Sequence, residues 1–416
     1  MASRTTFHKT HRRATAPGRV AALAASCLLC GAVSASAANL DVTPSISLDQ
    51  SYDSNVFNTD GNEKGDFILR ATPAVTFSLK MPETTLNLRT SLTSDTYYKY
   101  TERNSTSSAV TLALDATPPV RISPRLSIAP SGHFVQARDS YLRTQLVPSG
   151  DPLQPASIAT ENQIRKSRDY GAALRVIFLL TEKTEFSLAG GFTKRQFLDN
   201  AAGSDVDSRV VTGDTTLTHR FTPLLTSGLF FNTAYNTFEN GRDSRTVSGG
   251  LTGSYQFSPA VSMNARAGVS RAQETGVAGL PDRTTWSPAG SVSLTYAEGD
   301  FRAALTGSID QSGGGSFGLT TRRQSIGFSL TDRFARNWTA NLAGNFQENR
   351  SLDAAVTQDL SSATGTAGIG YQPAAWATLH LSGTALRQWS NGAVGTDLTR
   401  YSAFLGLTLG TTYNIY

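Results

Sequence analysis

The sequence has very few cysteines and methionines, and it has no apolar run long enough for a membrane helix. Its only two cysteines, Cys27 and Cys30, lie near the N-terminus, inside a segment that we expect to be removed. The rest of the chain can therefore form neither a disulfide framework nor a thiolate metal site. No later segment approaches the roughly 20 apolar residues that a transmembrane helix needs. These absences exclude a disulfide-stapled domain and a helical membrane protein.

The N-terminal segment has the three parts of a secretory signal peptide. Residues 1–19 carry five Lys and Arg side chains and no acidic one, and an apolar stretch follows over residues 20–33. The tripeptide at residues 35–37, Ala-Ser-Ala, is an A-x-A cleavage signature. We expect residues 1–37 to be a signal peptide and residues 38–416 to form the mature protein. A short N-terminal anchor is the alternative, although the apolar run is too short to span a bilayer as a stable helix.

The charge balance argues against a nucleic-acid partner. The whole chain has 37 Lys and Arg against 32 Asp and Glu, but five cations and no acid precede Ala37. The predicted mature chain is therefore electrically neutral. Overall basicity then gives no reason to expect nucleic-acid binding.

The dominant pattern from Val42 to Tyr413 is an alternation of apolar and polar residues, which places successive side chains on opposite faces of a sheet. One face of a predicted strand, for example, carries Tyr170, Ala172, Leu174, Val176 and Phe178. The connections alternate between short turns and longer polar loops. Tight turns on one side and longer loops on the other are typical of an up-and-down outer-membrane barrel.

The runs predict about eighteen strands, with sixteen as the alternative if a hairpin is merged or missed. Many runs reach twelve residues or more, whereas strands of soluble sandwiches usually have about five or six. A tilted transmembrane strand needs about nine to eleven residues. Aromatic residues also gather at the strand ends, where an interfacial girdle belongs. The predicted strands are 42–52, 67–79, 85–100, 105–116, 125–138, 166–180, 184–198, 209–220, 224–238, 244–257, 261–273, 284–296, 301–311, 319–331, 338–348, 360–371, 376–389 and 399–415.

We therefore predict an all-β fold, a transmembrane up-and-down antiparallel β-barrel in the cell outer membrane. Residues 38–416 form it as one domain. If the apolar parity faces lipid, the opposite parity faces water that the barrel encloses. The longest loop, Asp139 to Arg165, is the candidate to fold into this lumen.

The inward parity predicts a mostly basic lumen wall. These side chains either solvate a wide interior or select anionic or polyhydroxylated solutes. The predicted pore-lining residues are Arg70, Arg89, Asp95, Arg175, Arg195, Arg266, Arg302, Asp310 and Arg323.

The sequence offers no obvious catalytic or metal site. The three histidines after the leader, His133, His219 and His380, lie in distant predicted hairpins without a nucleophile motif or a metal-ligand spacing. The Asx-rich stretch at residues 53–62 lacks the alternating acids and the final Glu of a calcium loop. We expect no enzymatic activity, no cofactor and no metal. An outer-membrane hydrolase is the rival hypothesis.

The N-terminal hairpin resembles a known family. Residues 47–57, SLDQSYDSNVF, lead through a short acidic loop to residues 65–73, GDFILRATP. This pattern is similar to the β-barrel porin type 2 family over roughly residues 45–80, and beyond them the likeness is one of strand rhythm and length. The resemblance implies a porin-like barrel of a kind often associated with exopolysaccharide production and export. It supplies no catalytic residues.

The prediction for function is a porin-like channel that serves solute passage or exopolysaccharide export. The alternative from another class is a structural or adhesive surface protein with a closed lumen. Expected partners are outer-membrane lipid, the barrel-assembly machinery, and polysaccharide or small solutes, with no nucleic acid.

Overall fold

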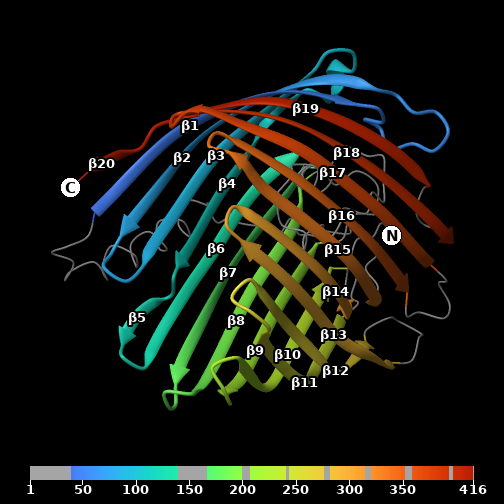
Figure 1. Cartoon of the computed structure of the whole chain (residues 1–416). Helices are drawn as coiled ribbons and strands as arrows, with labels where there is room; N and C mark the ends of the chain where they lie inside the picture. Colours follow the sequence, from blue (N-terminus) through green and yellow to red (C-terminus); the bar gives the residue numbers. More distant parts are fainter. Residues whose placement is uncertain are drawn as a thin grey trace, which may run out of the picture.

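The computed structural model describes residues 39–138, 166–198, 207–239, 243–275, 282–313, 320–351, 358–392 and 397–415. Within these ranges the chain forms one antiparallel sheet that closes into a barrel of eighteen wall strands (Figure 1). The predicted signal peptide, residues 1–37, and the loop at residues 139–165 lie outside the described residues.

The wall strands have 13 to 17 residues, which is longer than a tilted transmembrane strand requires. Two shorter strands, β5 (Val120–Ser123) and β20 (Tyr413–Ile415), and a 3-10 turn, η1 (Thr101–Arg103), accompany them. The wall strands are β1 (Asn39–Asp53), β2 (Asp66–Lys80), β3 (Thr85–Tyr97), β4 (Ser105–Thr117), β6 (Leu126–Arg138), β7 (Lys166–Leu179), β8 (Thr184–Phe197), β9 (Ser208–Arg220), β10 (Leu225–Phe238), β11 (Asp243–Gln256), β12 (Val261–Thr275), β13 (Arg283–Glu298), β14 (Phe301–Gly313), β15 (Thr320–Ala335), β16 (Trp338–Ser351), β17 (Gln358–Ala374), β18 (Ala377–Gly392) and β19 (Leu398–Gly410).

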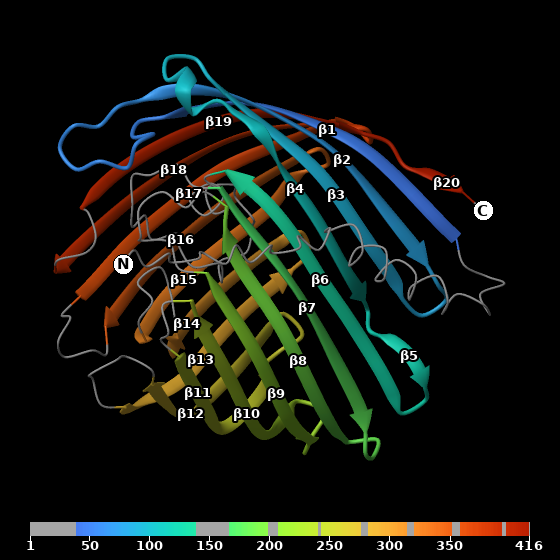
Figure 2. The same ribbon diagram turned by 180° about the vertical axis from the view of Figure 1, so that it is seen from behind.

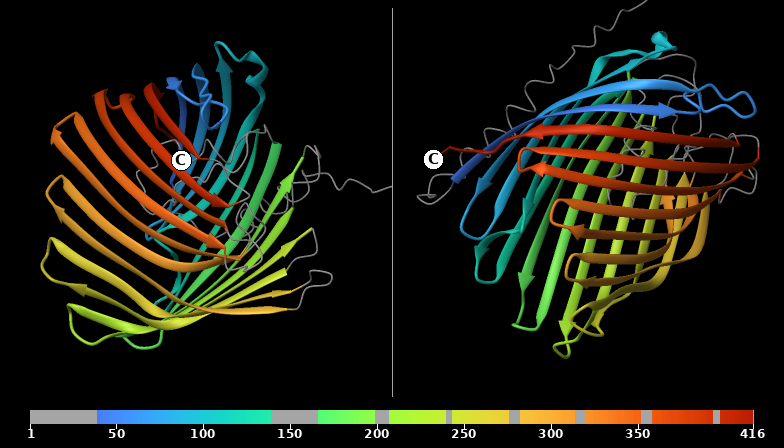
Figure 3. Two further views of the ribbon diagram at one scale, coloured as in Figure 1. Left: turned by 90° about the vertical axis from the view of Figure 1, so that its right-hand side faces the viewer. Right: turned by 45° about the horizontal axis from the view of Figure 1, so that its top comes forward.

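Each wall strand pairs with its neighbour in the sequence, and the barrel closes between β1 and β19. Residues 45–53 of β1 pair with residues 402–410 of β19, in register from Ser45–Gly410 to Asp53–Ser402. β19 lies beside β1 in the views of Figures 1 and 3, and Figure 2 shows the opposite wall from β6 to β9. Closure removes the free strand edges that an open sheet would expose.

The predicted count of eighteen strands is confirmed, and a few strand boundaries differ. β3 ends at Tyr97 rather than at residue 100, because the chain turns there into η1. The predicted last strand, 399–415, divides into β19 and β20. The division falls at residues 411–412, opposite Pro44, whose carbonyl accepts from the nitrogen of Thr411 at 3.3 Å but which has no N–H to donate in return.

The apolar parity of the strands faces outward. Leu251, Leu229 and Leu305 are 62%, 56% and 50% exposed, although a soluble protein would bury such side chains. Aromatic rings lie close together near the short turns, as in the stacked pair Trp338–Tyr371 with centroids 4.5 Å apart. An apolar outer surface with aromatic residues near its end fits a bilayer. No helix among the described residues is long and apolar enough to cross a membrane.

The two ends of the barrel can be told apart by their connections. Hairpins such as residues 299–300 and 336–337 turn within two residues at one end, where residues 39 and 415 also lie. The longer connections, such as residues 54–65, lie at the other end. In outer-membrane barrels the short turns are periplasmic and the long loops extracellular, which orients this barrel.

The extracellular end of β14 leaves the wall. Its ladder with β13 stops at the pair Gly290–Ile309, whereas its ladder with β15 continues to Gly313. The hydroxyl of Ser270 on β12 donates to the side-chain oxygen of Gln311 at 3.0 Å, and both residues are buried. Because Ser270 has the inward parity, the end of β14 lies against the inner face of the wall and narrows the barrel there.

The loop after β1 is fastened to the closing seam by buried polar contacts. Arg400 of β19 binds both carboxylate oxygens of Asp53, and its Nη1 donates to Asn58 Oδ1 at 3.1 Å. The side chain of the fully buried Asn55 makes two hydrogen bonds to Thr59. Its Nδ2 donates to the carbonyl oxygen at 2.8 Å, and its Oδ1 accepts from the backbone nitrogen at 3.0 Å. Asp53, Ser54 and Asn55, which we call the D-S-N segment, begin the Asx-rich stretch of the sequence and hold the first loop against the last wall strand.

Replacing Leu188 with Arg tests which parity faces lipid. Leu188 on β8 is 49% exposed on the outer face, and an arginine there should destabilise the folded barrel by roughly 2–4 kcal/mol. The adjacent Ser187→Arg variant has the same depth and the inward parity, so its cost should stay within about 0.5 kcal/mol. Urea unfolding in lipid vesicles measures both. Equal costs for the two variants would contradict the assignment.

Replacing Asp53 with Ala tests the seam contact. The change leaves the Arg400 guanidinium buried without its carboxylate, which should cost about 3–5 kcal/mol of unfolding free energy. The matched control is Asp359→Ala, which breaks the half-exposed pair with Arg350 and should cost no more than about 1 kcal/mol. A loss from Asp53→Ala no larger than the control's would show that the buried pair does not stabilise the seam.

Candidate functional site

All nine predicted lumen residues occupy inward positions of their strands. Neighbours in the sequence such as Leu69, Leu174 and Phe301 are exposed on the outer face, so the residues next to them point inward. The nine residues are distributed over β2, β3, β7, β8, β12, β14 and β15. The seven arginines among them differ in whether a carboxylate neutralises their charge.

Three of the arginines are neutralised, and all three lie in the extracellular half of their strands. In each case the register places a carboxylate directly opposite the arginine on the neighbouring strand. Two of the three pairs have two parallel N–O contacts, the geometry in which arginine binds carboxylate most specifically. The pairs are Arg70–Asp95, Arg195–Asp169 and Arg323–Asp310, with shortest N–O distances of 2.8, 2.8 and 2.6 Å.

The other four arginines lie in the periplasmic half of the lumen and have no carboxylate within ion-pair distance among the described residues. All four are exposed, as expected for side chains in a water-filled interior. We call them the uncompensated arginines: Arg89, Arg175, Arg266 and Arg302.

The periplasmic half also contains acids, but they are confined to one part of the wall. Asp115, Glu185 and Asp214 have the inward parity on β4, β8 and β9. From β10 to β18 the inward positions of this half carry Arg266, Arg302 and, near the short turn, Arg333, and no carboxylate among the described residues. This stretch of wall is therefore positive.

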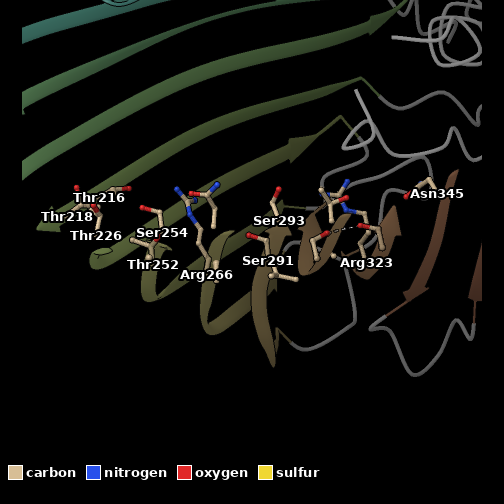
Figure 4. A pocket seen from close by; sticks show the side chains of 18 residues that line it. Thr216, Thr218, Thr226, Thr252, Ser254, Arg266, Ser291, Ser293, Arg323 and Asn345 are labelled. Carbon is tan, nitrogen blue, oxygen red and sulfur yellow. Dashed lines mark hydrogen bonds between the residues drawn. The ribbon is translucent and has the colours of Figure 1, made fainter. Parts of the chain in front are cut away.

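A cavity of about 510 Å³ lies on this positive wall, and we call it the β9–β16 cavity. Ten of its lining residues are Ser or Thr, and no carboxylate lines it (Figure 4). The strand register aligns the lining in two adjacent rows across the strands. The first row is Thr252, Arg266, Ser291, Ser308 and Ser325, and the second is Ser254, Asn264, Ser293, Thr306 and, past Gly327, Asn345.

Contacts within the cavity fix some of these groups and leave others available. The hydroxyls of Ser308 and Ser325 hydrogen-bond at 2.8 Å. Thr306 donates to the carbonyl of Gly327 at 3.3 Å. The guanidinium of Arg266 lies over the ring of the buried Phe230, 5.4 Å from the centroid, in a cation–π contact. The cavity thus combines a positioned cation with a wall of hydroxyl groups.

The three histidines lie on separate strands. His380 faces the lumen, stacks on Phe404 and has Nε2 3.4 Å from Asp49 Oδ1. The hydroxyl of Ser47 donates to that carboxylate at 3.0 Å and not to the imidazole, so it is not arranged as a nucleophile with a base. His133 has the inward parity on β6.

His219 has the outward parity on β9 and contacts one hydroxyl. Its Nδ1 lies 2.9 Å from Thr184 Oγ1. Among the described residues no carboxylate orients this ring, so the third member of a nucleophile–base–acid set is not found there. No group of metal-ligating side chains occurs in the described part of the chain.

The sequence pattern predicted the arginines and two of their carboxylate partners, Asp95 and Asp310, but it predicted neither the ion pairs nor the cavity. Asp169 was not among the predicted lumen residues, although its parity would have included it. The two hydroxyl rows depend on the register between six strands, β11 to β16, and Ser and Thr are too frequent in this sequence to indicate a site by themselves.

A closed barrel with apolar side chains outside and polar side chains inside is a membrane-spanning protein, because only such closure satisfies the backbone of a sheet in lipid. The chain is an all-antiparallel transmembrane β-barrel of the cell outer membrane. That class follows from the barrel itself.

Comparison with solved structures finds outer-membrane barrels of Pseudomonas aeruginosa. One is the outer membrane protein OpdK, with 11% identity over 90% of this chain and 99% of that chain and a TM-score of 0.45. Another is OccK2 (OpdF), with 11% identity over 90% and 98% and a TM-score of 0.46. A third is OccK8 (OprE), with 9% identity over 91% and 99% and a TM-score of 0.44. At these identities the likeness concerns the fold alone.

No family model matches the chain, and no curated protein matches it. The resemblance of residues 45–80 to the β-barrel porin type 2 family is therefore not confirmed.

Cysteine substitution tests the two faces at the cavity. The predicted mature chain has no cysteine, so single substitutions give clean signals. Ser291→Cys should react with a charged, membrane-impermeant thiol reagent in lipid vesicles, because its side chain faces water. The adjacent Val292→Cys should not react, because its side chain faces lipid. Mass spectrometry of the labelled protein measures both, and the opposite pattern would reverse the inside and the outside of the barrel.

Proposed function

We propose that the protein is a passive outer-membrane channel whose lumen favours small anions. The observation that carries the proposal is the set of four uncompensated arginines in the periplasmic half of the lumen. A barrel of this many strands encloses more space than its own side chains fill, so a water-filled passage is expected unless chain segments close it.

The distribution of charge supports selectivity for anions. At the extracellular half the inward arginines are neutralised by carboxylates directly opposite them, so a solute meets little net charge there. In the periplasmic half the wall from β10 to β18 presents Arg266 and Arg302 without a carboxylate. Rings or rows of arginine lower the electrostatic cost of an anion in a pore and raise that of a cation.

Two alternatives remain as proposals of different kinds. Exopolysaccharide passage is supported only by the resemblance of residues 45–80 to a family with that association. A structural or adhesive role with a closed lumen would require that no ions cross. Conductance through purified protein separates the closed-lumen alternative from the channel, since only a channel gives stepwise currents.

The reversal potential in a planar bilayer under a potassium chloride gradient tests the proposal. We expect stepwise currents and a reversal potential whose sign shows that chloride permeates more readily than potassium. Replacing the four uncompensated arginines with Gln should shift the reversal potential toward that of potassium, because four positive charges are lost while Asp115, Glu185 and Asp214 remain. Replacing the same four with Lys keeps the charge and should keep the chloride preference. Complete absence of current, or a potential unchanged by the Gln variant, would overturn the proposal.

A further inference from the structure

We infer that the β9–β16 cavity is a binding subsite for a small solute that carries one negative charge and several hydroxyl groups, as a sugar acid does. The inference rests on the proposed function, because the solute must enter the lumen. It adds the place on the lumen wall where the solute binds and the chemical class of that solute.

The lining of the cavity matches a polyhydroxylated partner. Ten Ser and Thr side chains line it, and each hydroxyl can both donate and accept a hydrogen bond. Solute hydroxyls have the same double capacity, so each can find a partner in either orientation. The two rows lie on consecutive inward positions of the strands, so a solute lying across β11 to β15 contacts several hydroxyl groups at once.

The charge in the cavity matches one anionic group. Two arginines line it, but the bidentate pair with Asp310 neutralises Arg323. Arg266 has no carboxylate within ion-pair distance among the described residues. The guanidinium presents a planar fork of donors that fits a carboxylate, and the aromatic contact with Phe230 limits its motion. One cation remains for one solute carboxylate.

A polar atom in the lining also has no partner. The side-chain nitrogen of Asn345, Nδ2, is buried and makes no hydrogen bond to any residue in the described part of the chain. Asn345 lies opposite Gly327, at the end of the second row, and lines the cavity. Buried polar groups are nearly always hydrogen-bonded, so an orphaned amide donor beside a cavity favours an oxygen-rich occupant.

Block of the channel current by gluconate tests the inference. Gluconate has one carboxylate and five hydroxyl groups, acetate has the charge without the hydroxyls, and glucose has the hydroxyls without the charge. We expect gluconate to reduce the chloride current through single channels at concentrations where acetate and glucose do not. Arg266→Gln should raise the half-blocking concentration by about tenfold or more, since a hydrogen bond to a charged group carries that much free energy.

Two variants separate a site from a general charge effect. Arg89→Gln removes the same charge from the same half of the lumen, on β3 and outside the cavity, and should raise the half-blocking concentration of gluconate far less than Arg266→Gln does. The double variant Ser291→Ala and Ser293→Ala keeps every charge and should weaken the block by gluconate several-fold.

The outcomes that contradict the inference differ from those that contradict the channel. Stepwise currents with equal block by gluconate and acetate would show that the hydroxyl rows do not bind solute. Equal effects of Arg89→Gln and Arg266→Gln would show that only overall charge matters, and block by glucose as strong as by gluconate would remove the role of Arg266. Absence of current in the parent protein would instead overturn the proposed function.

Discussion

The need to satisfy the backbone within lipid is the constraint on which the rest of the structure depends. A sheet edge in hydrocarbon leaves peptide groups without hydrogen bonds, so the eighteen wall strands must close. Closure occurs between β1 and β19, the first and the last wall strands. The buried contact between Asp53 and Arg400 lies at the extracellular end of this seam, where the first loop meets the last wall strand. The D-S-N segment therefore belongs to the closure of the barrel.

Closure then determines how charges combine on the inner face. Strand register places Asp169 opposite Arg195 and Asp310 opposite Arg323, and each pair neutralises itself. Arg266 faces Thr252 and Ser291 in the same way and finds no acid. The same residue type thus has two roles in one lumen, depending on which residue the neighbouring strand places beside it. Charge composition alone, which is balanced over the predicted mature chain, does not reveal this division.

The cavity arises from the same ladders. Small hydroxyl-bearing side chains at consecutive inward positions of β11 to β15 leave space that larger residues would fill, and the end of β14 folds against the wall nearby. The bond between Ser270 and Gln311 crosses from one wall strand to another without following the ladder. The sequence marks this departure only by the polar Gln311, which follows Ile309 at the next outward position of β14.

The sequence by itself determined the strands, their number and the face on which each side chain lies. Period-two patterning is local, and the parity that places Leu305 outside and Arg302 inside is set within a few residues. The tertiary structure decided which inward residues meet. The pairing of Arg323, the isolation of Arg266 and the alignment of Ser291 with Ser308 all depend on register between strands. Register is fixed by turn geometry and by closure of the whole ring, so it cannot be read from one strand alone.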